Sequence, residues 1–185
     1  MDIFIENFWW MIPNLALAGL GFVFALLYLN SRNYYLRILL FTLWFLFLPN
    51  TIYLVTDIEH FVAQIPQTDL LGSILLTIQY SVLIIFGIVT YFLGMRPMQT
   101  FFNKKSKKGK YDFVFIALNF AIGFAVVLGK VERTHSWYVF IQPNRVVQDV
   151  LSVLTDPILL SSVIIFGLFL NLVYFAFKNR LGSIK

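Results

Sequence analysis

The stretch from residue 70 to residue 93, LLGSILLTIQYSVLIIFGIVTYFL, contains no charged side chain. A helix rises about 1.5 Å per residue, so a helix of this length is longer than the bilayer hydrocarbon core, which is about 30 Å thick. An uncharged apolar run of this length is typical of a membrane span. We therefore predict that residues 70–93 form a transmembrane helix.

Four more apolar runs occur elsewhere in the chain. They cover residues 8–29, 38–55, 113–129 and 158–177. Hydrophobic residues make up 59% of the 185 residues and charged residues 12%, against about 25% charged residues in ordinary soluble domains. This composition excludes a soluble globular domain, a disordered tail and a disulfide-rich secreted module. We predict an all-α fold, a single polytopic membrane helix bundle of residues 1–185 with five transmembrane helices.

The lysines and arginines predict the orientation of the bundle, because cytoplasmic loops carry the basic excess of a membrane protein. With the N-terminus outside, eleven of the 14 lysines and arginines fall in inside segments and three in outside segments. Residues 1–6 include two acids, whereas a signal peptide begins with basic residues. We predict an N-out, C-in topology and no cleaved signal.

Two outer segments have apolar residues at helical spacing and polar residues opposite them. These segments are residues 57–65, followed by Pro66, and residues 144–154, preceded by Pro143 and followed by Asp156-Pro157. An amphipathic stretch beside a bilayer usually lies in the interface. We predict that both form short amphipathic interfacial helices on the outer face, which either cap the bundle or belong to a site.

The first polar motif lies at the outer end of the second span. Pro49 removes a backbone hydrogen bond inside that span and predicts a kink. Asn50 follows it, and Tyr53, Asp57 and His60 come at intervals of about one helical turn. Two interpretations stay open: a kink whose free groups are bound by Asn50 and Tyr53, or a polar pocket that opens outward.

The second polar motif follows the fourth span, at residues 129–138. It contains Arg133, Ser136 and Trp137, together with His135 and Tyr138. Tryptophan and tyrosine are enriched at membrane interfaces, so one interpretation is an interfacial anchor. The other interpretation is a binding or catalytic role for the polar side chains.

These motifs resemble those of a family of bacterial integral membrane proteins catalogued as domain of unknown function 1361. The first pattern, Leu-Pro-Asn-x-x-Tyr-x-x-Thr-Asp-x-x-His, is matched by Leu48, Pro49, Asn50, Tyr53, Thr56, Asp57 and His60. The second, Gly-x-x-x-Arg-x-x-Ser-Trp, is matched by Gly129, Arg133, Ser136 and Trp137. The family usually has asparagine before that serine and an acid after the tryptophan, where this chain has His135 and Tyr138. The resemblance implies a multi-pass protein of the bacterial cytoplasmic membrane and brings no known activity.

Some of these residues suit catalysis or metal binding by their chemistry. Asp57 and His60 have the composition of an acid–base pair, and Ser136 is a candidate hydroxyl for activation. The histidines, Asp57 and the nearby glutamates are possible metal ligands, but they follow no metal-binding spacing and the chain has no cysteine. We predict no metal and no cofactor.

Side-chain amides occur in four of the predicted spans. These amides are Asn50, Gln79, Asn119 and Asn171. Such groups hydrogen-bond between helices in membranes. A transport path is expected to show an ionisable group inside a span, and none lies well inside one here, which disfavours an ion transporter.

The cytoplasmic loop at residues 104–110 has five lysines. Lysines beside an anionic leaflet attract its headgroups, each by about 1 kcal/mol. We predict membrane lipids as partners, with anionic headgroups at this loop, and a possible membrane protein partner. Nucleic acid is not expected, because no folded domain presents the lysines.

Three functions stay open. The first is a non-catalytic accessory or lipid-binding bundle. The second is an extracytoplasmic hydrolase or transferase that acts on lipid, lipoprotein or envelope polymer, and the third is a small transporter. We also predict that one outward-facing pocket brings Asn50, Tyr53, Asp57 and His60 together with Arg133 and Ser136, and that Asp57 pairs there with Arg133. The predicted ligand-binding residues are Asn50, Tyr53, Asp57, His60, Arg133 and Trp137, and the catalytic candidates are Asp57, His60 and Ser136.

Overall fold

The structure is a computed structural model that describes residues 2–105, 111–135 and 137–181. Within these residues every regular element is a helix, which confirms the all-α prediction. Five helices are long and apolar enough to cross a membrane, which confirms the five predicted spans. They are Ile3–Asn30, Tyr34–Gln67, Leu70–Phe102, Asp112–Val131 and Pro157–Lys178.

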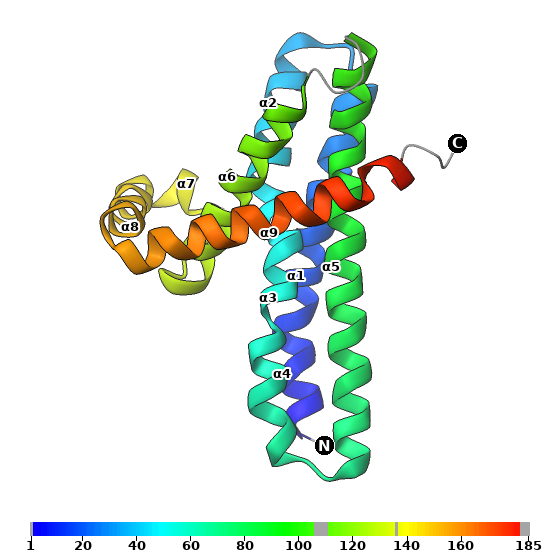
Figure 1. The fold of residues 1–185 in the computed structure, drawn as a ribbon, viewed down its shortest axis with the longest axis vertical. Helices are drawn as coiled ribbons and strands as arrows, with labels where there is room; N and C mark the ends of the chain where they lie inside the picture. The colour runs from blue at the N-terminus through cyan, green and yellow to red at the C-terminus, as the bar shows by residue number, and fades with distance from the viewer. Residues whose placement is uncertain (1, 106–110, 136, 182–185) are drawn as a thin grey trace. The chain divides into compact units, whose positions relative to one another are not determined.

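The chain divides into two compact units (Figure 1). Unit 1 is Met1–Pro97 and unit 2 is Met98–Lys185. The boundary falls inside one long helix, α5 (Leu70–Lys105). That the whole chain acts as a single membrane domain stays a prediction.

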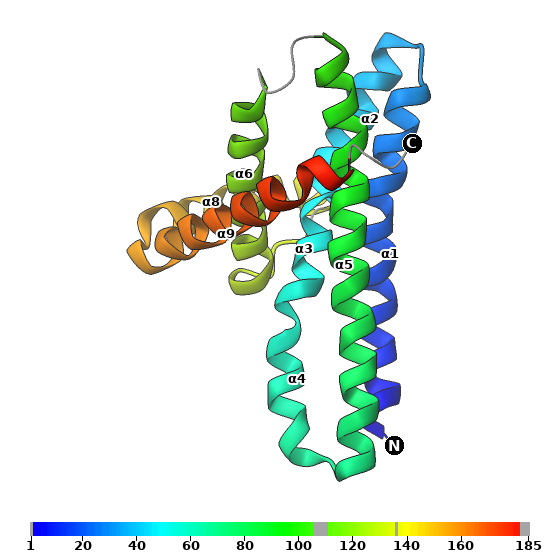
Figure 2. The ribbon, with the colours of Figure 1, turned by 45° about the vertical axis from the view of Figure 1, so that its right-hand side comes forward.

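Unit 1 is built from three passes of helix that lie along one another (Figure 2). The first pass is α1 (Asp2–Asn30) and the third is the part of α5 up to Pro97. The second pass consists of three helices joined end to end. They are α2 (Tyr34–Phe47), α3 (Pro49–Thr56) and α4 (Ile58–Gln64), followed by the short 3-10 helix η1 (Ile65–Gln67).

The break between α2 and α3 is caused by Pro49, which has no N–H to donate. The carbonyls beside the break are nonetheless bonded. The Asn50 amide donates to the carbonyl of Phe47 at 3.0 Å, and the Thr51 hydroxyl donates to that of Leu48 at 2.7 Å. Asn50 therefore stabilises the kink, as the structural interpretation of the motif expects.

α4 continues the second pass alongside α1 and α5 and does not cross their ends (Figure 2). The prediction that residues 57–65 form an interfacial helix is therefore not confirmed. The physical reason is that Phe61 packs onto the core of unit 1, with its ring centroid 5.4 Å from that of Tyr80. The helix keeps its direction until Pro66, which lies in η1.

α5 packs closely against the second pass on both sides of the break. A Cβ atom added to Gly87 would lie 2.5 Å from the carbonyl oxygen of Thr51. The Trp44 indole donates to the carbonyl of Gly94 at 3.0 Å. Glycine at position 87 thus allows two backbones to approach, as small residues do between membrane helices.

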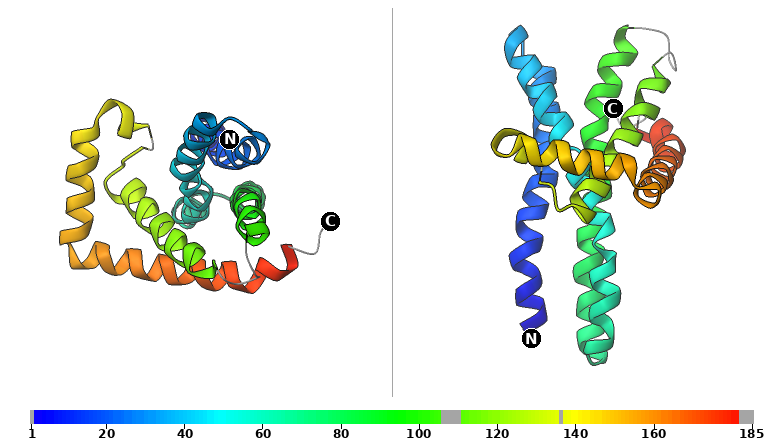
Figure 3. Two further views of the ribbon diagram at one scale, coloured as in Figure 1. Left: turned by 90° about the horizontal axis from the view of Figure 1, so that it is seen from above. Right: turned by 90° about the vertical axis from the view of Figure 1, so that its left-hand side faces the viewer.

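Unit 2 contains two long helices that pack against each other, and two shorter helices that come between them in the sequence (Figure 3). Its helices after α5 are α6 (Asp112–Val131), α7 (Tyr138–Ile141), α8 (Pro143–Thr155) and α9 (Pro157–Leu181). The Asn119 amide donates to Asn171 at 3.1 Å, which confirms that these amides join two spans. Asp112, at the start of α6, and Lys178, near the end of α9, form an ion pair with a distance of 2.6 Å.

α8 runs across the end of α9 and not along it (Figure 3). Val153 is buried in a small core with Val127, Leu128 and Val163. A neighbouring strip of α8 is apolar but exposed, with Val147, Leu151 and Leu154 between 50% and 59% accessible. The predicted helix over residues 144–154 is confirmed, and its position in the membrane plane stays a prediction.

Candidate functional site

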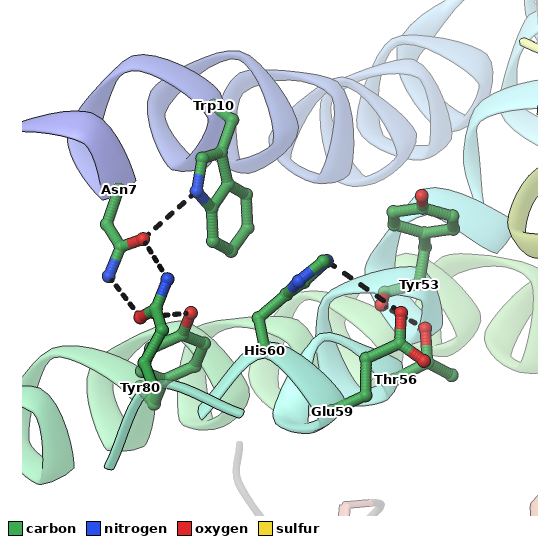
Figure 4. A network of polar contacts seen from close by, with 8 residues as sticks. Asn7, Trp10, Tyr53, Thr56, Glu59, His60 and Tyr80 are labelled. Atoms are coloured by element: carbon green, nitrogen blue, oxygen red, sulfur yellow. Dashed lines mark hydrogen bonds and ion pairs between the residues drawn. The ribbon is translucent and has the colours of Figure 1, made fainter. Parts of the chain in front are cut away.

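A network of side-chain hydrogen bonds joins α1, α4 and α5 near the N-terminal end of unit 1 (Figure 4). The Asn7 amide donates to Gln64 at 2.9 Å and to Gln79 at 3.1 Å. Gln64 donates back to Asn7 at 3.0 Å. The Trp10 indole also donates to Asn7, at 3.2 Å, and the Tyr80 hydroxyl donates to Gln64 at 3.1 Å. We call these five residues the amide network.

The amide network satisfies polar groups that would otherwise be buried without partners. Asn7 is only 1% exposed and Tyr80 also 1%. Buried polar groups need hydrogen bonds, and a bond between membrane helices contributes about 0.6–2 kcal/mol. Sequence reasoning missed Asn7 and Trp10. Their signal was an amide inside the first apolar helix, followed by an indole three residues later on the same face.

His60 lies beside this network but does not belong to it. Its ring centroid is 5.3 Å from that of Trp10 (Figure 4). Its Nε2 atom is 3.7 Å from the carboxylate of Glu59, and both side chains are more than half exposed. His60 therefore presents an imidazole at the surface of unit 1, backed by an indole ring.

Asp57 separates α3 from α4 and is buried, with an exposure of 1%. Its carbonyl accepts the backbone N–H of His60 at 3.0 Å. Its carboxylate is within electrostatic range of the Tyr80 phenol. Tyr53 is half-buried one turn before Asp57, and its carbonyl accepts the Thr56 hydroxyl at 2.6 Å. The structure thus brings Asp57 and His60 to the edge of the amide network. The Asn50 amide instead donates to the Phe47 carbonyl at the break between α2 and α3.

The second motif begins where α6 ends, in unit 2. The backbone N–H groups of Glu132 and Thr134 both donate to the carbonyl of Leu128, at 3.2 Å each. Arg133 lies between them with a φ of 53°, which is the left-handed conformation. Glycine is the usual residue at such a helix end, because a side chain strains this conformation. Arg133 is exposed.

Three polar contacts tie the loop after α6 to α8, and a fourth lies within α8. The Thr134 hydroxyl donates to Asp149 at 2.5 Å, and the Ser152 hydroxyl donates to Glu132 at 2.7 Å. Arg145 donates to the carbonyl of Glu132 at 3.4 Å and lies 3.7 Å from the Asp149 carboxylate. The loop and α8 therefore form one small structure on the surface of unit 2.

Aromatic rings gather on the same loop. The His135 ring stacks on Trp137 at a centroid distance of 4.5 Å, with the planes 8° apart. Tyr138 meets both rings edge-on, and the Arg145 guanidinium lies 4.8 Å from the Tyr138 centroid. Burial lowers the pKa of His135, and the positive charge of Arg145 lowers that pKa further. The His135 ring that stacks on Trp137 therefore stays neutral down to a lower pH than an ordinary histidine does.

The residues predicted for one site are shared between the two units. Asp57 and His60 belong to unit 1, and Arg133 and Trp137 belong to unit 2. Ser136 lies outside the described residues, as do residues 106–110 of the lysine loop. The common pocket and the Asp57–Arg133 pair stay a prediction. Among the described residues, no three histidine, aspartate or glutamate side chains form a group able to hold a metal ion.

Both motifs lie within residues 13–173, which match the family described as "Protein of unknown function (DUF1361)". The chain belongs to this family. The expected resemblance is thereby confirmed over most of the chain, and this multi-pass membrane architecture comes with no assigned activity. No curated protein and no solved structure is significantly similar to the chain.

Proposed function

We propose that this membrane protein is a non-catalytic bundle that binds lipid at the outward-facing end of its helices. The observation that carries this proposal is the amide network. Its polar groups are bonded to one another across α1, α4 and α5. Amides and hydroxyls that bond to one another between helices stabilise the bundle. They do not supply the acid, base and nucleophile that covalent catalysis needs.

The surroundings of His60 support the same function. A general base needs a nearby hydroxyl or water to activate, and the neighbours of this imidazole are the Trp10 ring and Glu59. The hydroxyl of Thr56 already donates to a backbone carbonyl. An exposed imidazole, an indole and a carboxylate at the end of a span suit contact with lipid headgroups.

The alternative is an extracytoplasmic enzyme, and one observation favours it. Asp57 is buried, and His60 follows it by one turn with an exposed ring. An aspartate that orients a histidine is common in general base catalysis. We rank the enzyme hypothesis second, because the described residues offer no nucleophile beside the His60 imidazole.

The experiment uses the full chain in nanodiscs made from equal parts of phosphatidylglycerol and phosphatidylcholine. Native mass spectrometry then counts the lipids that stay bound to the released protein. We expect one lipid class to be enriched over the nanodisc composition. Retention of both lipids in the starting ratio would contradict a lipid site that selects its headgroup, and would leave only the bilayer contacts of any membrane protein.

The enzymatic alternative is tested on the same samples. Lipid composition is followed over hours for the native protein and for His60→Ala, with Glu59→Ala as a matched exposed control. We expect no product from any of the three proteins. A product that forms with the native chain and Glu59→Ala, but not with a folded His60→Ala variant, would establish the enzyme instead.

A further inference from the structure

Arg133 has a backbone conformation that its side chain does not favour. It lies at the end of α6 with a φ of 53°, the only positive φ among the described non-glycine residues. Glycine or asparagine adopts this conformation at lower cost. Strained residues of this kind cluster at functional sites, because the surrounding structure must hold them in place. The hydrogen bonds from the loop to α8 provide that support.

The Arg133 side chain differs from that of Arg145 in its contacts within the described part of unit 2. Within the described part of that unit, no hydrogen bond, ion pair or ring contact involves its guanidinium. Arg145, on the same small structure, differs in each respect. It binds the Glu132 carbonyl, lies beside the Asp149 carboxylate and stacks on Tyr138. Arg145 is therefore a structural arginine, whereas the Arg133 side chain is exposed at the surface of unit 2.

α8 indicates the depth at which that charge lies. Its exposed apolar strip of Val147, Leu151 and Leu154 suits burial at the boundary of headgroups and acyl chains. Trp137 and Tyr138 belong to the same level, since such rings gather at the membrane interface. The polar contacts between loop and α8 hold Arg133 close to this level. Phosphate groups of lipids occupy that level.

We propose that Arg133 is the anion-binding residue of a lipid site, and that the loop after α6 and α8 hold it against the phosphate of an anionic headgroup, whose charge no choline ammonium offsets as it does in phosphatidylcholine. The inference rests on the lipid-binding function proposed above and names the residue and the chemical group. Arginine suits this task, because its planar guanidinium binds two phosphate oxygens at once. The exposed strip of α8 lies on the face opposite its contacts to the loop, where it adds contacts to acyl chains below the headgroups.

The test compares variants at position 133 in the nanodisc experiment with phosphatidylglycerol and phosphatidylcholine. Arg133→Gly removes the guanidinium and also relieves the backbone strain. We expect this variant to retain about tenfold less phosphatidylglycerol, with an unchanged or higher melting temperature. Arg133→Lys keeps the charge without the two-point geometry and is expected to give an intermediate loss. Arg32→Gln, which removes an exposed arginine in unit 1, is the control and should bind lipid as the native chain does.

Each result has a definite meaning. If the native chain enriches neither lipid, the proposed function fails together with this inference. If the native chain enriches phosphatidylglycerol and Arg133→Gly does so equally, this inference alone is wrong. This inference is also wrong if Arg133→Gly lowers both the melting temperature and the lipid retention, because the loss of lipid would then follow from a loss of structure.

A second measurement separates lipid phosphate from free phosphate. The detergent-solubilised full chain is titrated with inorganic phosphate, and its competition with bound phosphatidylglycerol is followed by native mass spectrometry. We expect millimolar phosphate to displace little of the lipid, because α8 adds apolar contacts. Complete displacement at that concentration would assign the site to a free anion and overturn the lipid assignment.

Discussion

At the scale of single residues, the contact that most defines unit 1 is the reciprocal amide pair of Asn7 and Gln64. The two side chains are 57 residues apart in sequence and exchange bonds of 2.9 and 3.0 Å. Asn7 also accepts from Trp10, and Gln64 accepts from Tyr80. Removing one amide therefore leaves several buried groups without a partner, which costs more than the bonds alone.

We predict that Asn7→Leu lowers the free energy of unfolding by about 1–3 kcal/mol. Gln67→Leu is the matched control, since the Gln67 amide binds only the carbonyl of Ala63 on its own turn. Unfolding in mixed micelles with increasing denaturant measures both. The double variant Asn7→Leu/Gln64→Leu should lose less than the sum of the single losses, because it removes both partners. Strict additivity would show that the two amides are not energetically coupled.

His135 provides a second prediction at this scale, concerning pH. Burial and the charge of Arg145 lower its pKa, so the folded loop binds this proton less readily than the unfolded chain does. The resulting stability is present above the unfolded pKa of about 6.5 and is lost as the pH falls through the lower, folded value. NMR titration of the His135 ring should therefore give a midpoint below about 6.5.

The variant Arg145→Gln tests the cause of that shift. It should raise the His135 midpoint only in part, because burial is the larger cause and remains. Arg32→Gln, which removes an arginine in the other unit, should leave the midpoint unchanged. A midpoint that does not move with Arg145→Gln would mean that the two groups are not electrostatically coupled.

At the scale of helices, the close packing of α5 against α3 requires that residue 87 has no Cβ atom. A Cβ atom at Gly87 would meet the Thr51 carbonyl oxygen at 2.5 Å and the Leu54 Cβ atom at 3.0 Å. Backbone cannot move aside as a flexible side chain does, so the helices themselves would have to separate. The Pro49 break lies close to this contact, at the start of α3.

We predict that Gly87→Ala lowers the free energy of unfolding by about 1–3 kcal/mol through overpacking. Gly19→Ala is a matched control in another long helix, because a Cβ atom there would meet nothing within 4 Å. Alanine favours a helix over glycine, so the control should be neutral or slightly stabilising. Thermal unfolding of the two variants in the same detergent compares them. Equal effects at both positions would contradict the close approach of α5 and α3.

At the scale of the whole molecule, the positive-inside pattern makes a prediction about the sides of the membrane. The chain contains no cysteine, so single cysteines can be introduced without background. With the N-terminus outside, His60→Cys should react with an impermeant thiol reagent added to intact cells. Asn33→Cys and Ser106→Cys should react only after the membrane is opened. Labelling of positions 60 and 106 from the same side would rule out the five-span topology.

The number of spans and the helical class followed from the sequence because they depend on local composition. An uncharged run such as residues 70–93 must satisfy its backbone within one helix in a bilayer, whatever its neighbours are. The kink at Pro49 was equally local, since proline lacks its own N–H. The prediction of a helix over residues 144–154 rested on the spacing of its valines and leucines.

Tertiary structure alone decided which polar groups meet. Asn7 finds Gln79 across 72 residues of chain, and no pattern within either helix identifies that partner. It also decided that α4 continues the second pass, where Phe61 packs beside Tyr80 on the core of unit 1. Arg133 stood in a sequence motif, but its left-handed backbone and the exposure of its side chain emerged only from the way α6 ends. Helix formation in a bilayer is a local matter of backbone hydrogen bonds, whereas the pairing of side chains depends on which faces the helices bring together.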